Sequence, residues 1–83
     1  MALVNVQVRF YSILKQYARE HGIGDVLTLS VEEGTTISQI VERAGIPIRR
    51  VGRYMKNGQI LQPDYAPAEG DVIDVIPPTI SGG

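Results

Sequence analysis

The chain has 83 residues, enough for one small domain with a modest core. Apolar residues make up 43% and charged residues 20%, as in a folded globular domain, and the net charge of -1 gives no general attraction for polyanions. The absence of cysteine excludes disulfides, thiolate metal sites and cysteine nucleophiles. With no signal-peptide pattern and no apolar run of about 20 residues, we expect a cytoplasmic protein that binds neither nucleic acid nor membrane and holds no metal.

The first third of the chain predicts two strands around a short helix. Strict alternation of apolar and polar residues over 4–10 predicts a half-buried strand. A helix over 13–21 is expected next, with Ser12 as its cap. Its inner face would carry Ile13, Leu14, Tyr17 and Ala18. A second alternating run over 26–31 predicts another strand.

The clearest predicted helix covers 37–44. Thr36 and Gln39 have the spacing of a capping box, in which each side chain satisfies a free backbone amide of the first turn. Gly45 is suited to close the helix in a left-handed conformation, and Pro47 prevents its continuation.

The remainder predicts a hairpin and a last strand. Asn57-Gly58 is a strong turn pattern between strand-like runs, and residues 63–70 read as a loop. The last strand covers 71–76. Five strands with two helices on one side indicate an α+β fold, and the first and last strands, both strongly apolar, suit neighbouring places in the middle of the sheet. From the topology we infer that these two strands pair in parallel, which would deliver the tail at the end where the first strand finishes.

Residues 77–83 follow this strand and organise our functional interpretation. Pro77-Pro78 cannot extend a sheet ladder, so they should direct the chain away as an arm that reaches about 23 Å at roughly 3.3 Å per residue. The arm ends in Gly82-Gly83, and a glycine carboxylate leaves room for an enzyme to grip the backbone near the reacting carbon. We therefore divide the chain into a domain, 1–76, and a flexible diglycine tail, 77–83.

Two surfaces are candidate contact sites. If Ile73 and Val75 point inward, Val72 and Ile76 face outward and form an apolar docking patch, while Ile80 adds an apolar residue to the tail. A basic cluster could steer an acidic partner or contact RNA, but it is most simply a solvated surface. It comprises Arg49, Arg50, Arg53 and Lys56.

Several of these segments together resemble the ThiS/MoaD sulfur-carrier family, which has the ubiquitin-like β-grasp fold. The resemblance covers nearly the whole chain. The segments that carry it are the strand 4–10, Gly34-Thr35-Thr36 before the helix, Asn57-Gly58, the run from Glu69-Gly70-Asp71 to Ile76-Pro77-Pro78, and Gly82-Gly83. The length and the helix after the first strand look most like the small subunit of molybdopterin synthase.

That resemblance implies a carrier with no catalytic residues and no bound cofactor of its own. A ubiquitin-activating-type enzyme would use ATP to adenylate Gly83, and sulfur transfer would then give a thiocarboxylate. The tail would enter the large subunit of molybdopterin synthase and donate sulfur for the molybdenum cofactor. Thr79-Ile80-Ser81 is bulkier than is usual in that branch, a departure that bears on the choice of acceptor.

Alternative functions remain open at this point. The carrier could serve a thiazole synthase in thiamin synthesis or a cysteine pathway. The same activated carboxyl group could instead be joined to lysines, which would make the chain a ubiquitin-like modifier. More distantly, the domain could be a β-grasp binding module of the kind found beside RNA-handling enzymes, although such a module would not need a diglycine end.

Overall fold

The computed structural model describes residues 2–78 and contains two helices, a 3-10 turn and five strands. The elements are β1 (Leu3–Phe10), α1 (Ile13–Glu20), β2 (Val26–Glu32), α2 (Ile37–Arg43), the 3-10 turn η1 (Ile48–Arg50), β3 (Arg53–Lys56), β4 (Gln59–Leu61) and β5 (Val72–Ile76). All five strands join one mixed sheet in the order β2-β1-β5-β3-β4. The predicted α+β fold is confirmed.

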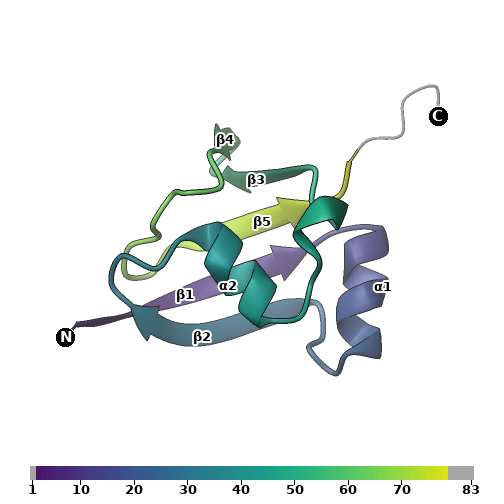
Figure 1. The fold of residues 1–83 in the computed structure, drawn as a ribbon, viewed down its shortest axis with the longest axis horizontal. Coiled ribbons are helices and arrows are strands. Elements are labelled where there is room, and N and C mark those ends of the chain that lie inside the picture. Colours follow the sequence, from purple (N-terminus) through teal and green to yellow (C-terminus); the bar gives the residue numbers. More distant parts are fainter. Residues whose placement is uncertain (1, 79–83) are drawn as a thin grey trace.

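The last strand lies in the middle of the sheet. β5 pairs in parallel with β1, where Phe10 aligns with Val75, and antiparallel with β3, where Tyr54 aligns with Val75. Figure 1 shows α2 lying across one face of the sheet and α1 standing at the end where β1 and β5 finish. The predicted parallel pairing of the first and last strands is confirmed.

The core lies between this face and the helices. Alternating positions of β1 and β5 point into it, and Ile73 and Val75 are fully buried as predicted. Leu14 and Ala18 enter the core from α1. The α2 stripe of Ile37, Ile40 and Val41 covers its centre. Because both helices pack against the same face of the sheet, the opposite face is left open.

Local sequence patterns account for the start of α2 and for the turn between β3 and β4. The capping box is present: the Gln39 amide donates to Thr36 Oγ1 at 3.2 Å, and the Thr36 amide donates to Gln39 Oε1 at 2.9 Å. At the β3–β4 turn, Asn57 and Gly58 both have positive φ, 52° and 80°, as a tight hairpin requires. Both predictions are confirmed.

Three details differ from expectation. Ser12 precedes α1 with a φ of 57° and makes no side-chain cap hydrogen bond, so its predicted capping role is wrong. Ile13 is 60% exposed, because Leu14 and Ala18 take the inward positions of this two-turn helix and turn Ile13 outward. The sequence patterns do not predict η1, because its three residues are too few to show a helical period.

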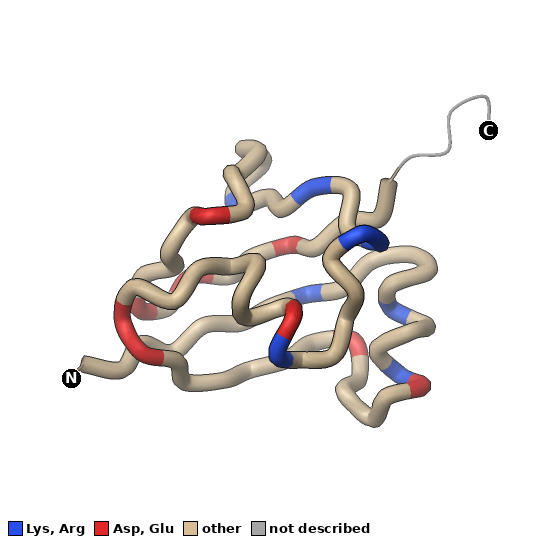
Figure 2. The backbone as a smooth tube through the Cα atoms, in the orientation of Figure 1, with Lys and Arg blue, Asp and Glu red and all other residues tan. Residues whose placement is uncertain are grey.

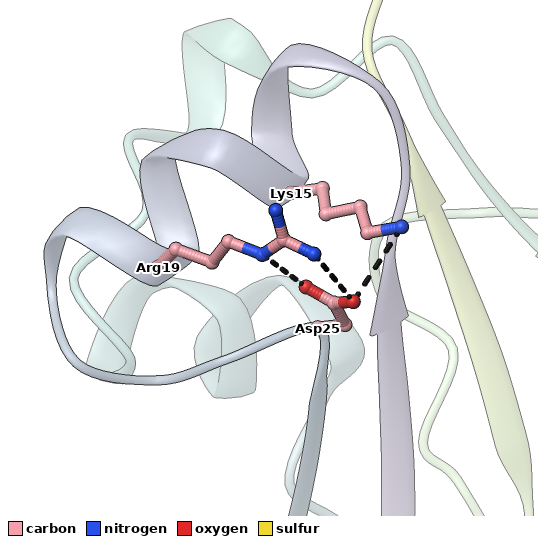
Figure 3. Close-up of polar contacts among 3 residues, drawn as sticks. All are labelled: Lys15, Arg19 and Asp25. Atoms are coloured by element: carbon pink, nitrogen blue, oxygen red, sulfur yellow. Dashed lines mark hydrogen bonds and ion pairs between the residues drawn. The ribbon is translucent and has the colours of Figure 1, made fainter.

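An exposed ion pair links α1 to Asp25, just before β2. Arg19 donates from Nε to Asp25 Oδ1 at 2.8 Å and from its terminal nitrogen to Oδ2 at 3.0 Å, and Lys15 Nζ lies 3.5 Å from Oδ2 (Figure 3). The hydrogen bonds from Arg19 hold the pKa of Asp25 below its usual value. The contact adds to the packing of Leu14 and Ala18, which hold α1 against the sheet.

Candidate functional site

The chain leaves the sheet from its middle strand, at the end where α1 begins. β5 stops at Ile76, and Pro77 and Pro78, which lack amide hydrogens, cannot continue the ladder. Figure 1 shows the described chain departing from the sheet at this point. We call Ile76–Pro78 the tail root.

Backbone contacts from both sides hold the tail root and the residue just before it. The Gly52 amide donates to the Ile76 carbonyl at 2.7 Å, and the Tyr11 amide donates to the Val75 carbonyl at 3.3 Å. A Cβ added to Gly52 would lie 2.6 Å from both Cα and N of Pro78, closer than real Cβ contacts. Only glycine therefore allows this close approach, and Gly52 positions the tail.

Sequence reasoning missed this role of Gly52. The available indication was a glycine inside a strand-like run, which often marks a close backbone approach. The run alone does not identify the segment that approaches, because Pro78 is 26 positions away in the sequence (78 minus 52).

The open face of the sheet carries apolar side chains that extend from the tail root along β5 and across to β3 and β4. Val72 and Ile76 point to this face and are half-buried. The strand register adds Met55, opposite Asp74, and then Ile60, opposite Met55 and 63% exposed. We call Met55, Ile60, Val72 and Ile76 the outer-face patch. Val72 and Ile76 lie where the sequence placed them, Met55 and Ile60 were missed, and the docking role of the patch stays a prediction.

The single acidic residue of β5 on this face is neutralised by a partner. Arg9 donates from Nε to Asp74 Oδ1 at 2.7 Å, and Tyr11 Oη lies 3.3 Å from the same oxygen. The hydrogen bond to Asp74 raises the pKa of Arg9 above its usual value, so the guanidinium stays charged. The outer-face patch therefore borders an ion pair rather than an isolated carboxylate.

The predicted basic cluster is divided by the structure. Lys56 lies at the far end of β3 and pairs with Asp71 at 2.9 Å, so its inclusion in the cluster is wrong. The other three members stay near the tail root, on η1 and at the start of β3, as the basic segments in Figure 2 show. Within residues 2–78, none of Arg49, Arg50 and Arg53 has a carboxylate oxygen within 4 Å.

A hollow of about 250 Å³ opens between α1, η1 and the tail root. Its lining consists of Ile13, Leu14, Tyr17, Arg49, Arg50, Pro77 and Pro78. We call it the tail-root groove. No sequence pattern indicates this groove, because its three walls come from separate parts of the chain.

Three of the predicted functional residues lie outside the described residues: Ile80, Gly82 and Gly83. The division between a domain ending at 76 and a tail from 77 likewise stays a prediction. From Pro78, the five residues to Gly83 can span at most about 17 Å at roughly 3.3 Å each.

Within residues 2–78 we see no group of three or more histidine, aspartate or glutamate side chains that could hold a metal ion. The same part of the chain contains no helix that is both long and apolar enough to cross a membrane.

Comparison with protein families gives a match over nearly the whole chain. The sequence pattern of the family described as Mut7-C ubiquitin matches residues 3–81. None of the curated proteins compared with the chain is similar to it in sequence.

Solved structures agree on the fold. Small archaeal modifier protein 1 from Haloferax volcanii superposes with a TM-score of 0.71 at 14% identity, covering 92% of this chain and 99% of that one. A Pyrococcus furiosus protein described as molybdopterin converting factor, subunit 1, gives 0.69 at 20% identity, with 92% and 99% covered. Caldiarchaeum subterraneum ubiquitin gives 0.62 at 18% identity, with 98% and 100% covered. The predicted ubiquitin-like β-grasp fold is confirmed.

Proposed function

The chain belongs to the Mut7-C ubiquitin family, and from that premise we propose that it is a sulfur carrier rather than an enzyme. In this proposal a ubiquitin-activating-type enzyme adenylates Gly83, a thiocarboxylate forms there, and the sulfur is donated in the synthesis of molybdopterin. The chain is thus a substrate of its partners' catalysis.

The observation that carries this proposal is the way in which the chain leaves the sheet. A central strand, held by pairing on both sides, ends in two prolines whose path is set by the contact with Gly52. Such an arrangement gives a fixed starting point to a segment that ends in Gly82-Gly83. A fixed starting point favours delivery of the terminal carboxylate into the active site of another protein.

The chemistry requires activation because a terminal carboxylate, with a pKa of about 3.5, is ionised and a poor electrophile at neutral pH. An oxygen of the Gly83 carboxylate would form a bond to the α-phosphorus of ATP while pyrophosphate leaves. Hydrosulfide sulfur would then attack the acyl carbon and displace AMP, giving the thiocarboxylate. ATP is assigned to the partner, since the sequence has no glycine-rich phosphate loop ending in Lys-Ser or Lys-Thr.

We assign the enzyme in which the sulfur is donated as the large subunit of molybdopterin synthase, in preference to thiazole synthase. The structural similarity to the Pyrococcus furiosus protein, whose description names molybdopterin conversion, supports this choice. The surfaces proposed to contact the partners are the tail residues Pro77, Pro78 and Ile80, and the outer-face patch.

A ubiquitin-like modifier is the second candidate, favoured by the similarity to small archaeal modifier protein 1. The activation step is the same in both functions. They differ in the last nucleophile, which is sulfur for the carrier and a lysine amine of a target protein for the modifier. An experiment must therefore identify the product rather than the adenylate.

The test is incubation of the chain with a ubiquitin-activating-type enzyme from the same genome, ATP and sodium sulfide, followed by mass spectrometry of the C-terminal peptide. We expect the mass to rise by one oxygen-to-sulfur exchange, with no change when ATP is omitted. An unmodified C-terminal peptide together with lysine-linked conjugates would show that the chain acts as a modifier and not as a sulfur carrier. A natural chain that continues past Gly83 without being processed would contradict both.

A further inference from the structure

The tail-root groove has an apolar floor and walls from three elements. Leu14 is fully buried at its base, while Ile13 is 60% exposed beside it. Ile13 and Tyr17 lie four residues apart, on one face of α1, and Pro77 and Pro78 form the opposite wall. The groove therefore offers a continuous apolar surface that the fold itself does not cover.

The size of the groove restricts what it can hold. Its volume of about 250 Å³ lies below the roughly 300–1,000 Å³ of typical small-molecule sites. A space of this size suits one large apolar side chain of another protein better than a nucleotide or cofactor.

The charges at the groove favour an acidic partner. The Arg50 guanidinium carbon lies 5.7 Å from the centre of the Tyr17 ring, and that ring also stacks on His21 at 4.3 Å between centroids. Arg49 lies next to Arg50 in the lining, and no carboxylate of residues 2–78 pairs with either. Arginines without an internal partner can form bidentate bonds with carboxylates from outside.

The charge also gives the groove a direction. A shallower hollow continues along α1, where its lining includes Gln16 and Glu20. The carboxylate of Glu20 disfavours further acidic groups at that end, whereas Arg49 and Arg50 favour them beside the tail root. The acidic groups of the partner should therefore lie close to the point where the chain leaves the sheet.

The position of the groove suits an enzyme that acts on the tail. Any active site that holds Gly83 must come within five residues of Pro78, at most about 17 Å, so its rim faces this end of the domain. The outer-face patch lies on the open side of the sheet, whereas the groove lies on the helix side. The two surfaces approach the tail root from different sides.

We propose that the tail-root groove is a docking site for a partner protein, which inserts one large apolar side chain between Ile13, Tyr17 and Pro78 and places carboxylates against Arg49 and Arg50. The adenylating enzyme is the partner that we name, and this identification rests on the proposed function. The chemistry inferred for the partner, an apolar side chain flanked by acidic groups, does not rest on the proposed function.

The first test needs no enzyme. An acetylated hexapeptide of two glutamates, a leucine, a phenylalanine and two more glutamates is titrated into the ¹⁵N-labelled 83-residue chain. We expect the amide signals of Tyr17 and Arg50 to move, and binding to weaken at least tenfold when lysines replace the glutamates. A 12-residue uridine RNA is titrated in parallel.

Matched variants locate the binding. The double variant Arg49→Glu/Arg50→Glu should weaken peptide binding at least tenfold, and Ile13→Ser should weaken it several-fold. Arg43→Glu is the control, because Arg43 is exposed at the end of α2 and lies outside the groove lining. An unchanged pattern of remaining amide signals shows that each variant is folded.

Three outcomes would overturn the proposal. They are shifts confined to the outer-face patch, equal binding of the acidic and basic peptides, and stronger binding of the RNA than of the acidic peptide. The last result would make the groove a nucleic-acid site instead.

The second test uses the adenylating enzyme. Arg49→Glu/Arg50→Glu should raise the KM for the chain about tenfold or more with kcat changed less than twofold, since the groove contributes binding away from the reacting carboxylate. A lower kcat at unchanged KM would contradict docking. If the wild-type chain is not thiocarboxylated at all, the proposed function fails, while the peptide titration still decides on the groove.

Discussion

The two ends of β3 differ in how they use their charges. At the Lys56 end, Lys56 Nζ donates to Tyr65 Oη at 3.0 Å, Tyr65 Oη donates to Asp71 Oδ2 at 2.7 Å, and the Ala68 amide donates to the same oxygen at 2.9 Å. We call Lys56, Tyr65, Ala68 and Asp71 the loop network. At the other end, Arg53 lies near Arg49 and Arg50, and no carboxylate of residues 2–78 pairs with them.

We therefore expect the Lys56 end of β3 to matter for stability and the arginine end to matter for partner binding. The loop network joins the loop before β5 to β3, so its hydrogen bonds contribute to folding. At the tail root, Arg49, Arg50 and Arg53 have no carboxylate partner among residues 2–78, so these charges contribute little to folding and, in our proposal, are available to a partner protein. Changes at the two ends should therefore have opposite consequences, and the following predictions test that expectation.

The largest effect is expected at the tail itself. Deleting Gly82-Gly83 should abolish sulfur transfer, because the activated carboxylate is lost, and should leave thermal unfolding unchanged. The core residues run from Val4 to Val75, well before the deletion. Mass spectrometry and circular dichroism melting measure the two quantities. A broadened or lowered melting transition would show that the tail belongs to the folded domain.

The next effect comes from Gly52→Ala. The new Cβ must displace Pro78, so we expect transfer to fall about tenfold or more while stability falls by only about 1 kcal/mol, the value of roughly one hydrogen bond. The control is Gly58→Ala in the hairpin, whose φ of 80° is unfavourable for alanine. It should cost about 1–2 kcal/mol of stability without reducing transfer in the folded fraction. Similar rates of sulfur transfer in the two variants would contradict the positioning role of Gly52.

Tyr65→Phe tests the opposite end. It leaves the largely buried Asp71 carboxylate without one donor, and we expect a loss of about 1–3 kcal/mol by urea denaturation with transfer unaffected. Tyr11→Phe is the matched control, because Tyr11 is exposed and its longer contact to Asp74 should be worth less than about 0.5 kcal/mol. Equal losses of stability in the two variants would mean that the loop network stabilises the fold no more than an exposed contact does.

The smallest effect is a pH dependence of stability. Burial raises the pKa of Asp71, but hydrogen bonds from Ala68, Tyr65 and Lys56 outweigh it and hold the pKa below its usual value. A lowered folded-state pKa contributes stability above the unfolded pKa of about 3.9, and this is lost as the pH falls through the folded value. Asp71→Asn should therefore be less stable than wild type at pH 7, and its stability should fall less below about pH 4.

Some acid sensitivity should remain in that variant. The pKa of Asp25 is lowered chiefly by the hydrogen bond from Arg19, and that of Glu69 chiefly by the Asn5 backbone amide. Urea denaturation at several pH values measures the difference between variant and wild type. An unchanged slope in Asp71→Asn would show that Asp71 is not responsible for the acid sensitivity.

Local patterns determined most of the fold. Alternation over 4–10 specified a half-buried strand, Thr36 and Gln39 specified the start of α2, and Asn57-Gly58 specified the hairpin. Each of these patterns depends on residues only a few positions apart, whose backbone preferences are set largely by their own side chains. The same reasoning failed at Ser12, where the backbone takes a positive φ that no local pattern indicates.

The sequence by itself therefore determined the two helices and five strands, their order and the glycines from which the carrier proposal begins. Only the tertiary structure decided that Gly52 touches Pro78, that Ile60 joins Val72 on the open face, and that Lys56 turns away from the arginines. These contacts depend on strand register and on the packing of segments distant in the chain. No short stretch of sequence contains that information, because each contact exists only once the whole sheet has formed.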